Sequence, residues 1–210
     1  MSLAVQSDGT VVVRAPTKID DEQITKFVAQ KQMWIVSKLS KIKNNQDKFG
    51  DVMNYQQYLL YGNKYRLAMA DVKKVEVHNP SQTILIPNRI EQDRALQAVY
   101  QFYKKKAKDV LSKRLAYLQS IMRIEPKAVS FSNSKGRWGA CNSHGKILLN
   151  WRIIMLPPNC IDYVIIHELC HLIEMNHSSR FWNLLQTFLP NFSESREQLR
   201  EYGFLLEMYR

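Results

Sequence analysis

Two histidines and a glutamate at residues 167–171 have the spacing with which one helix holds a metal ion and a base beside it. His167 and His171 are four residues apart. On an α-helix their side chains therefore lie on one face, about 5–6 Å apart at Cβ, and both imidazoles reach one ion. Glu168 lies about 100° round the helix from His167, where a general base for a metal-bound water is needed.

Chance is a poor explanation for this pattern. With five His and ten Glu among 210 residues, an H-E-x-x-H run is expected only about 0.006 times. Residues 161–173 are apolar nearly all round the helix, which is typical of a buried element. Buried polar groups need partners, and a shared cation supplies one. We therefore predict a metal site here, and a hydrogen-bonded pair of core histidines is the alternative interpretation.

The third ligand is either Glu174 or His177, and we predict His177. Glu174 shares a face with His167, but a rise of 1.5 Å per residue puts its Cα about 10 Å further along a straight helix. His177 follows His171 by six residues, which is the offset in H-E-x-x-H-x-x-G-x-x-H sites, where the chain turns back. We expect the reversal at Met175 and Asn176, with Asn176 left-handed. Three histidines then leave a fourth zinc position for water.

The elements around this helix predict an α+β fold, because runs of strands are followed by helices. Residues 128–131, 137–141 and 146–151 have the pattern of three short strands, and helical patterns cover residues 179–190 and 193–202. The expected catalytic portion is a small antiparallel sheet plus the metal-bearing helix. A parallel, doubly wound sheet is the fold that this pattern disfavours.

The strand at residues 137–141 is a candidate for binding substrate. As an edge strand beside the metal it would pair with an extended peptide through backbone hydrogen bonds. Gly139 and Ala140 would let the substrate backbone come close, and Trp138 either walls a side-chain pocket or belongs to the core.

The first half of the chain predicts hairpins and helices. Asp8-Gly9 is a strong turn signal between β-branched runs, and Gly62-Asn63 separates two further strands. Residues 40–50 are polar, and we expect a loop there. The expected elements are a hairpin over residues 3–14, a helix from residue 20 or 21 to about 42, strands within 55–69, a hairpin over 73–87 and a long helix over 91–122.

Positive charge is concentrated in this first half. Of the formal net charge of +11, residues 1–128 contribute +10, with 22 Lys/Arg against 12 Asp/Glu. We divide the chain into a basic N-terminal portion (1–125) and a catalytic portion (126–210). The long helix carries lysines at 104–106, 108 and 113, interleaved with Tyr100 and Tyr103. This stripe is either a solvated face or a surface for nucleic acid.

The three cysteines match no disulfide or C-x-x-C pattern, and the chain shows neither a secretory leader nor a membrane span. We therefore expect reduced thiols, a cytoplasmic location and no membrane partner.

The motifs together resemble one known family. Residues 136–141 (GRWGAC), 149–152 (LNWR), 164–171, 176–177 and 180–182 (RFW), with the opening run 7–16, resemble the YgjP-like metallopeptidases along nearly the whole chain. Ala140 departs from that pattern, in which Ser is more usual. The resemblance implies a zincin-like catalytic portion with His167, His171 and His177 as zinc ligands and Glu168 as the base. Proteases with related motifs, of the SprT-like and WLM types, act on proteins crosslinked to DNA.

The expected activity is therefore peptide-bond hydrolysis by a zinc-activated water. Arg152 and Tyr202 are candidates for stabilising the oxyanion. A UTP pyrophosphatase activity, proposed for a relative, is the alternative, although the chain has no Gly-rich phosphate loop and no carboxylate cluster for magnesium. A basic nucleic-acid-binding module with a structural metal is the second alternative. Oligomeric state is not indicated by the sequence.

Overall fold

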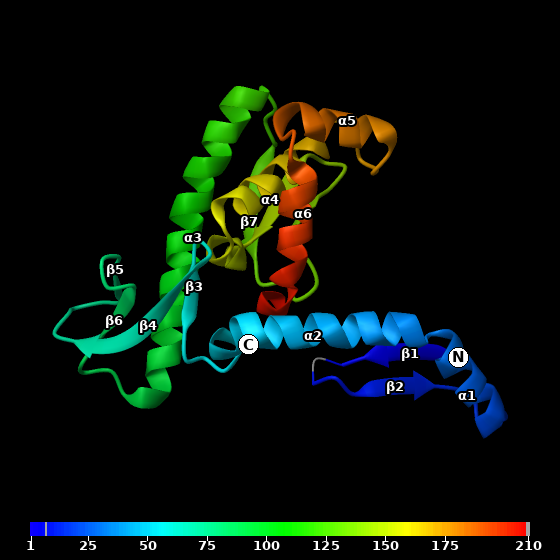
Figure 1. Ribbon diagram of the computed structural model, residues 1–210. Coiled ribbons are helices and arrows are strands. Elements are labelled where there is room, and N and C mark those ends of the chain that lie inside the picture. The colour runs from blue at the N-terminus through cyan, green and yellow to red at the C-terminus, as the bar shows by residue number, and fades with distance from the viewer. Residues whose placement is uncertain (7, 209–210) are drawn as a thin grey trace. The chain divides into compact units, whose positions relative to one another are not determined.

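The computed structural model describes residues 1–6 and 8–208, and its mixed helices and small sheets confirm the predicted α+β class. The chain forms two compact units, which we call unit 1 (Met1–Asn54) and unit 2 (Tyr55–Arg210) (Figure 1). No helix among the described residues is long and apolar enough to cross a bilayer.

Unit 1 begins with the predicted hairpin. Gly9 takes the left-handed backbone that the turn needs, with φ of 89°. Ser7, the first residue of the predicted turn, lies outside the described residues. Asp20 caps the next helix by accepting a hydrogen bond from the Gln23 N–H at 2.8 Å. The elements of unit 1 are β1 (Ser2–Val5), β2 (Val11–Arg14), α1 (Asp21–Gln30) and α2 (Gln32–Met53).

The prediction of a loop at residues 40–50 was wrong, because this stretch is helical and belongs to α2. The predicted single helix is also divided, at Lys31. The polar stretch contains no proline, and Leu39, Ile42, Phe49 and Val52 continue the apolar positions at helical spacing. Polarity alone therefore gave a false loop signal, since a largely exposed helix needs few apolar positions.

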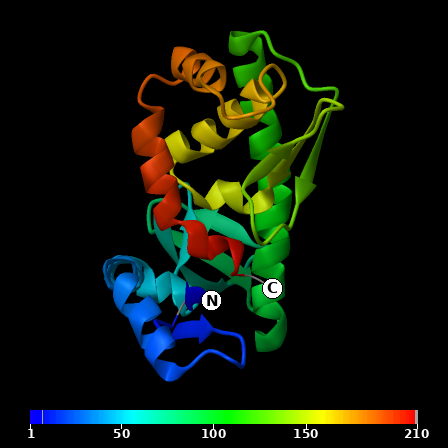
Figure 2. The ribbon, with the colours of Figure 1, turned by 90° about the vertical axis from the view of Figure 1, so that its right-hand side faces the viewer.

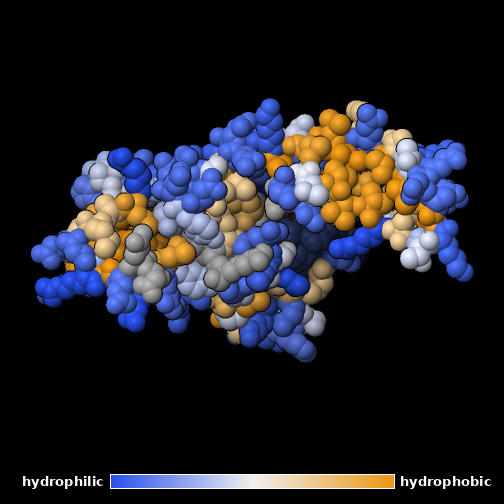
Figure 3. All heavy atoms as spheres, turned by 90° about the horizontal axis from the view of Figure 1, so that it is seen from below, coloured by the Kyte–Doolittle hydropathy of each residue, from blue (hydrophilic) through white to orange (hydrophobic). Residues whose placement is uncertain are grey.

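Unit 1 has a thin core, as expected for so few residues. None of the α1 residues is buried. Apolar side chains (orange) are visible among the mostly hydrophilic atoms of the face in Figure 3. The large apolar residues that unit 1 exposes include Met1, Val11, Met33, Trp34 and Val36.

The first sheet of unit 2 has four strands in the order β3-β4-β6-β5. β4 and β6 run parallel, whereas β3 with β4 and β5 with β6 are antiparallel pairs. The turn between β3 and β4 uses two left-handed residues, Tyr61 and Gly62. The strands are β3 (Tyr58–Leu60), β4 (Asn63–Ala70), β5 (Glu76–His78) and β6 (Thr83–Pro87).

A single long helix, α3 (Gln92–Met122), runs along unit 2 (Figure 2). Tyr103, Ala107 and Leu111 are fully buried on one side of it, where it packs on the short helix η1 (Trp151–Met155) and on α4 (Pro158–Cys170), the helix predicted to bind the metal. The Tyr103 hydroxyl donates to the Leu59 carbonyl at 2.7 Å. Arg114 of α3 donates two hydrogen bonds, of 2.6 and 2.7 Å, to the Asp162 carboxylate. α3 is thereby tied to both the first sheet and the candidate site.

The second sheet is mixed, so the prediction of an antiparallel sheet needs correction. Its order is β7-β9-β8, with β7 parallel and β8 antiparallel to β9. Residues 133–138 carry the chain past β9 to its far side, and Asn150 holds this connection by donating to the Ser134 and Arg137 carbonyls at 2.7 and 3.1 Å. β8 is at the edge, as expected. The strands are β7 (Ala128–Ser132), β8 (Gly139–Cys141) and β9 (Lys146–Asn150).

Three α-helices complete unit 2. The central one, α4, is apolar on nearly every side and packs against η1, α3, α5, α6, β8 and β9. Within unit 2, α3 from the predicted N-terminal portion thus packs directly on the predicted catalytic portion. The division of the chain at residues 125/126 into a basic portion and a catalytic portion stays a prediction. The last elements are α4 (Pro158–Cys170), α5 (Ser179–Phe188), α6 (Phe192–Glu201) and the short η2 (Gly203–Leu206).

Candidate metal centre

Three histidine side chains converge at the C-terminal end of α4. His167 lies in the last turn of that helix, His171 directly follows it, and His177 lies just before α5. The His167 Nε2 is 3.2 Å from the His171 Nε2 and 3.1 Å from the His177 Nε2. One ligand atom from each of the three residues lies within 4.8 Å of the others. The structure therefore brings together the three residues that the sequence predicts as metal ligands.

The chain reverses between His171 and His177 differently from the prediction. α4 already ends at Cys170, and the Leu172 and Ile173 N–H groups donate to the carbonyls three residues back, in a tight turn. Asn176 is not left-handed; instead its side-chain oxygen accepts a hydrogen bond from the Ser178 N–H at 3.3 Å. The reversal is thus stabilised by a short turn and an Asx-type hydrogen bond.

Glu174 contributes to the site through its backbone. Its carbonyl oxygen lies 3.0 Å from the Nδ1 of His171. Since a carbonyl only accepts, this Nδ1 carries a proton, which leaves Nε2, facing the His167 ring, as the nitrogen of His171 that could bind a metal. The Glu174 carboxylate is 3.9 Å from the Arg180 guanidinium. Glu174 therefore orients the His171 ring through its carbonyl rather than through its side chain.

The donor set fits a tetrahedral metal ion. Three nitrogens bound at about 2.0–2.1 Å in a tetrahedron are about 3.3 Å apart, close to the 3.1 and 3.2 Å found. Hydrogen bonds alone do not satisfy these three nitrogens, because a single proton on the His167 Nε2 can be donated to the Nε2 of His171 or of His177, but not to both. The buried Nδ1 of His167 has no hydrogen-bond partner among the described residues. A shared cation would satisfy the three lone pairs together.

The surroundings of His167 and His177 favour their neutral forms, which are the forms that bind a metal. Burial, followed by the neighbouring His171, His177 and Arg196, lowers the pKa of His167 to about 3. Burial also lowers the pKa of His177, and His171 and Arg196 act in the same direction. Protonation is therefore a weak competitor for metal at the lone pair of His167 near neutral pH.

Aromatic residues of α5 fix the ring orientations. Phe181 stacks on His171 with ring centroids 4.6 Å apart, and Trp182 stacks on His177 at 5.4 Å. The Trp182 indole N–H also donates to the His177 carbonyl at 3.1 Å. The guanidinium group of Arg196, from α6, lies over the Trp182 ring, 4.8 Å from the ring centroid. Sequence spacing gave no signal for Arg196, because α6 is brought to the site only by tertiary packing.

Glu168 lies beside the three histidines in an apolar environment. Its side chain is almost fully buried, and its Oε2 has no hydrogen-bond partner among the described residues. Burial raises the pKa of Glu168 to about 7, and the positive charge of Arg137 partly offsets that rise. A carboxyl with a pKa near neutrality is suited to accept and return a proton.

Gly139 of β8 provides the space for the Glu168 carboxyl. A Cβ at this glycine would lie 2.5 Å from Oε1 and 2.7 Å from Cγ of Glu168. Such distances are well below van der Waals contact, so any larger residue would displace the carboxyl or the strand. The missing side chain of this glycine makes room for the glutamate, and the close approach of a substrate backbone to Gly139 stays a prediction.

A small cavity of about 210 Å³ opens beside the site. Trp138 and Gly139 line it, whereas Ala140 does not, since neighbouring residues of a strand face opposite sides. Its other lining residues are Tyr163, Val164, His167, Glu168 and Leu199. Substrate binding by Trp138, Gly139 and Ala140 stays a prediction, and the geometry favours the first two.

The two candidates for oxyanion stabilisation lie elsewhere. Arg152 is fully buried and donates to the Met208 carbonyl and the Asn133 side chain at 2.7 Å each. Tyr202 is also buried and does not line the cavity. Burial, with the nearby Cys160 and Glu201, raises the pKa of Tyr202 to about 12. Tyr163 is the phenol that lines the cavity, and burial raises its pKa, so that it stays protonated.

Comparison with known proteins agrees with this geometry. The model of one protein family, described as the YgjP-like, metallopeptidase domain, matches residues 1–202. Neither a curated protein nor a solved structure matches the chain.

Replacing His177 should weaken metal binding, whereas replacing the Glu174 side chain should not. We expect His177→Ala to lower zinc affinity by more than about 10-fold, because it removes one of three converging nitrogens. Glu174→Ala keeps the carbonyl that orients His171 and should change the affinity by less than about 3-fold. Competition titration with a chromophoric zinc chelator measures both. A larger loss in Glu174→Ala than in His177→Ala would assign the third ligand to the carboxylate.

Replacing Glu168 with Gln should stabilise the metal-free protein at high pH. The folded-state pKa of Glu168 is raised from 4.5 to about 7, so folding is weakened as pH rises through this window and the buried carboxyl ionises. At pH 8 the variant should be more stable by roughly 3 kcal/mol, falling below about 1 kcal/mol near pH 5.

Urea unfolding in the presence of chelator measures this difference. Glu125→Gln is the matched control, because Glu125 is exposed, and it should change stability by less than about 0.5 kcal/mol at both pH values. A gain in Glu168→Gln that is independent of pH would show that burial of the charge is not its cause.

Proposed function

The chain belongs to the YgjP-like metallopeptidase family, and on that basis we propose that it is a zinc-dependent peptidase with Glu168 as the general base. The observation that carries the proposal is the convergence of three histidine Nε2 atoms next to a buried carboxyl with an unpartnered oxygen. Three histidines with a neighbouring glutamate are typical of open, catalytic zinc sites rather than closed, structural ones.

His167, His171 and His177 would hold the zinc. When bound, the ion would supply a Lewis acid and lower the pKa of a water in its fourth position to about 7. The stacking of Phe181 and Trp182 on two of the rings supports a preorganised site.

Glu168 would move the proton. Its Oε2, which has no partner among the described residues, would take a proton from the attacking water and return it to the leaving amine. The raised pKa of Glu168 supports this exchange, since a base near neutrality both accepts and donates. Tyr163, a protonated phenol lining the same cavity, is available to donate a hydrogen bond to the developing oxyanion.

The edge strand β8 would bind the substrate backbone. β8 pairs only with β9 among the described strands, so its other side is available to an extended peptide. The cavity beside it would accept one substrate side chain, and its walls of Trp138, Val164 and Leu199 favour an apolar one.

We also propose that the protein works in the cytoplasm, where the reducing environment keeps cysteines as thiols. All three cysteines are free thiols: Cys141 is half-buried, and Cys160 and Cys170 are buried. Burial raises the pKa of Cys170 to about 12, so that this thiol next to a ligand stays protonated and unreactive.

An assay with three substrates tests the function. Purified protein with one equivalent of zinc should cleave casein or members of a peptide library, chelator should stop cleavage, and UTP should remain intact. Glu168→Gln should lower turnover at least about 100-fold while zinc stays bound, because general-base catalysis is worth that much. Hydrolysis of UTP without hydrolysis of peptides would replace the peptidase by a nucleotide pyrophosphatase. Full peptidase activity of Glu168→Gln would reject its role.

Gly139→Ala should reduce turnover without removing zinc, because the added methyl group would displace the Glu168 carboxyl. We expect a loss of about 10- to 100-fold in kcat, the scale of a misplacement of about 1 Å. Gly136→Ala is the matched control, since a Cβ there meets nothing within 4 Å, and its kcat should be unchanged. Equal kcat values for the two variants would show that the contact between β8 and the base is not needed.

A further inference from the structure

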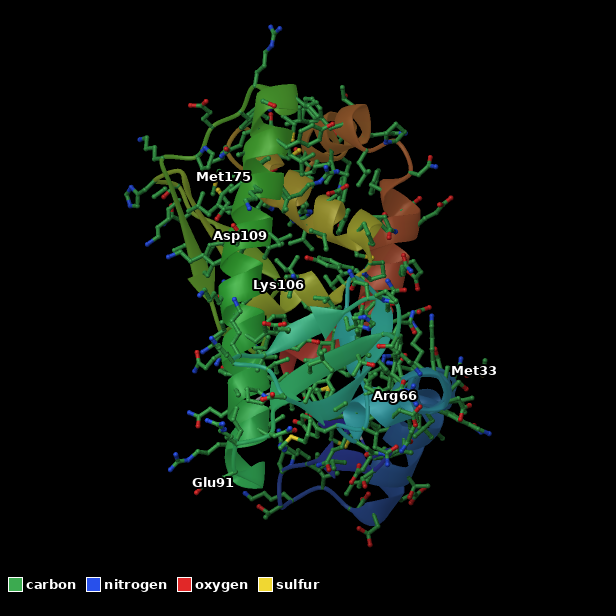
Figure 4. The ribbon with its side chains drawn as sticks, turned by 90° about the vertical axis from the view of Figure 1, so that its left-hand side faces the viewer. Met33, Arg66, Glu91, Lys106, Asp109 and Met175 are labelled. Atoms are coloured by element: carbon green, nitrogen blue, oxygen red, sulfur yellow. The ribbon has the colours of Figure 1, made fainter. Side chains whose placement is uncertain are left out.

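A groove lies along α3 in unit 2, lined by residues that the candidate metal centre does not use. Three adjoining cavities, of about 570, 410 and 670 Å³, share Ala98 as a lining residue. One wall is a stripe of α3 residues at helical spacing: Ala98, Gln101, Phe102, Lys105, Lys106 and Asp109. Figure 4 shows α3 from its outer side, with Lys106 and Asp109 labelled. We call this hollow the α3 groove.

The opposite wall comes from two other segments of unit 2. Residues 71–75, which follow β4, and residues 87–90, at the end of β6 and just after it, line the same cavities. Three separate segments of the chain therefore meet around the groove. A solvated lysine face on an isolated helix does not require such a second wall.

Positive charge from all three segments surrounds the groove. Lys73, Lys74, Arg89, Lys105 and Lys106 line it, and none of these five forms an ion pair within the part of the chain that the structure describes.

Two of the carboxylates at the groove are already paired. Asp109 lies 2.9 Å from the Lys113 Nζ, and Glu91 lies 3.3 Å from the Arg94 guanidinium. Their negative charge is therefore largely offset locally, and Asp71, the third lining carboxylate, faces five lysines and arginines without ion pairs among the described residues. The groove as a whole should therefore attract anions.

The apolar side chains of the two walls are half-buried, and we call them the apolar floor of the groove. Val72, Val75, Ile90 and Ala98 line it together with Phe102, whose ring has the Lys106 Nζ 5.7 Å from its centroid. Apolar surface with cations at its rim matches a ligand that has flat apolar groups joined by regularly spaced anions.

We propose that the α3 groove binds single-stranded nucleic acid, with bases on the apolar floor and phosphates at the lysines and arginine. A duplex hides its base faces and would leave the apolar floor unused. Tyr100 and Tyr103, which first suggested stacking, do not provide it: Tyr103 is fully buried, and the Tyr100 ring packs edge-on against Trp151. Phe102, which lines the groove, is instead the aromatic residue on which a base would stack.

Fluorescence anisotropy of the full chain with a labelled 20-nucleotide oligo-dT or oligo-U tests the proposal. The titrations contain chelator, so the result does not depend on zinc or on hydrolysis. If about five phosphates are contacted, affinity should fall about 100-fold between 50 and 200 mM salt. An affinity that hardly changes with salt would overturn the proposal.

Charge-reversal variants locate the binding surface. Lys105→Glu with Lys106→Glu, and separately Lys73→Glu with Lys74→Glu, should each weaken binding at least about 10-fold. Lys108→Glu with Lys127→Glu makes the same change in net charge on exposed lysines that do not line the groove, and should change affinity less than about 3-fold. Equal losses in all three double variants would show that overall charge, not the groove, binds the oligonucleotide.

Phe102→Ala and two competitors test the apolar floor. Phe102→Ala should weaken oligonucleotide binding about 5- to 10-fold, as loss of a stacked base does, with unchanged circular dichroism as the check on folding. A duplex of the same length and polyglutamate should compete at least about 10-fold less well. If either competes equally, or if Phe102→Ala binds normally, the base-binding role of the groove is rejected. Preference for oligo-U over oligo-dT distinguishes RNA from DNA as the natural strand.

Discussion

The candidate site depends on one constraint: an almost wholly apolar helix buries a carboxyl and two imidazoles that it cannot satisfy by itself. α4 packs on every side against other elements of unit 2, so water is kept from Glu168 and largely from His167. The result is a carboxyl with a pKa of about 7 and an imidazole with a pKa of about 3, both shifted toward their neutral forms by burial. Near neutral pH the carboxyl can therefore both accept and return a proton, and the imidazole keeps its lone pair.

The surrounding elements preserve this arrangement by packing rather than by hydrogen bonds. Phe181 and Trp182 press on two of the imidazoles, and β8 leaves space for Glu168 by carrying no side chain at Gly139. A polar network around the base would lower its pKa through hydrogen bonds to the charged form. The apolar enclosure instead raises the pKa of Glu168. Burying such a group lowers the stability of the fold, which is typical of functional sites.

Local patterns predicted much of the fold and the candidate ligands, because His167, His171 and His177 lie within one short stretch and their spacing fixes their meeting point. The prediction that the second sheet is antiparallel was wrong, because no local pattern shows that residues 133–138 carry the chain past β9. The contact of Gly139 with Glu168 was not predicted for a similar reason, because strand and helix meet only in the tertiary structure. Arg196 and the second wall of the α3 groove likewise come from segments without a recognisable motif.

The absence of a side chain between β8 and Glu168 has a mechanical consequence. The backbone of Gly139 and the carboxyl of Glu168 are in direct contact, so the position of the proton acceptor follows the position of the strand. On the proposed function, a peptide that adds to the free edge of β8 would press that strand toward α4, and the Glu168 carboxyl with it. A ligand that contacts only the three histidines would exert no such force. An extended chain and a small molecule would then differ in their effect on the proposed base.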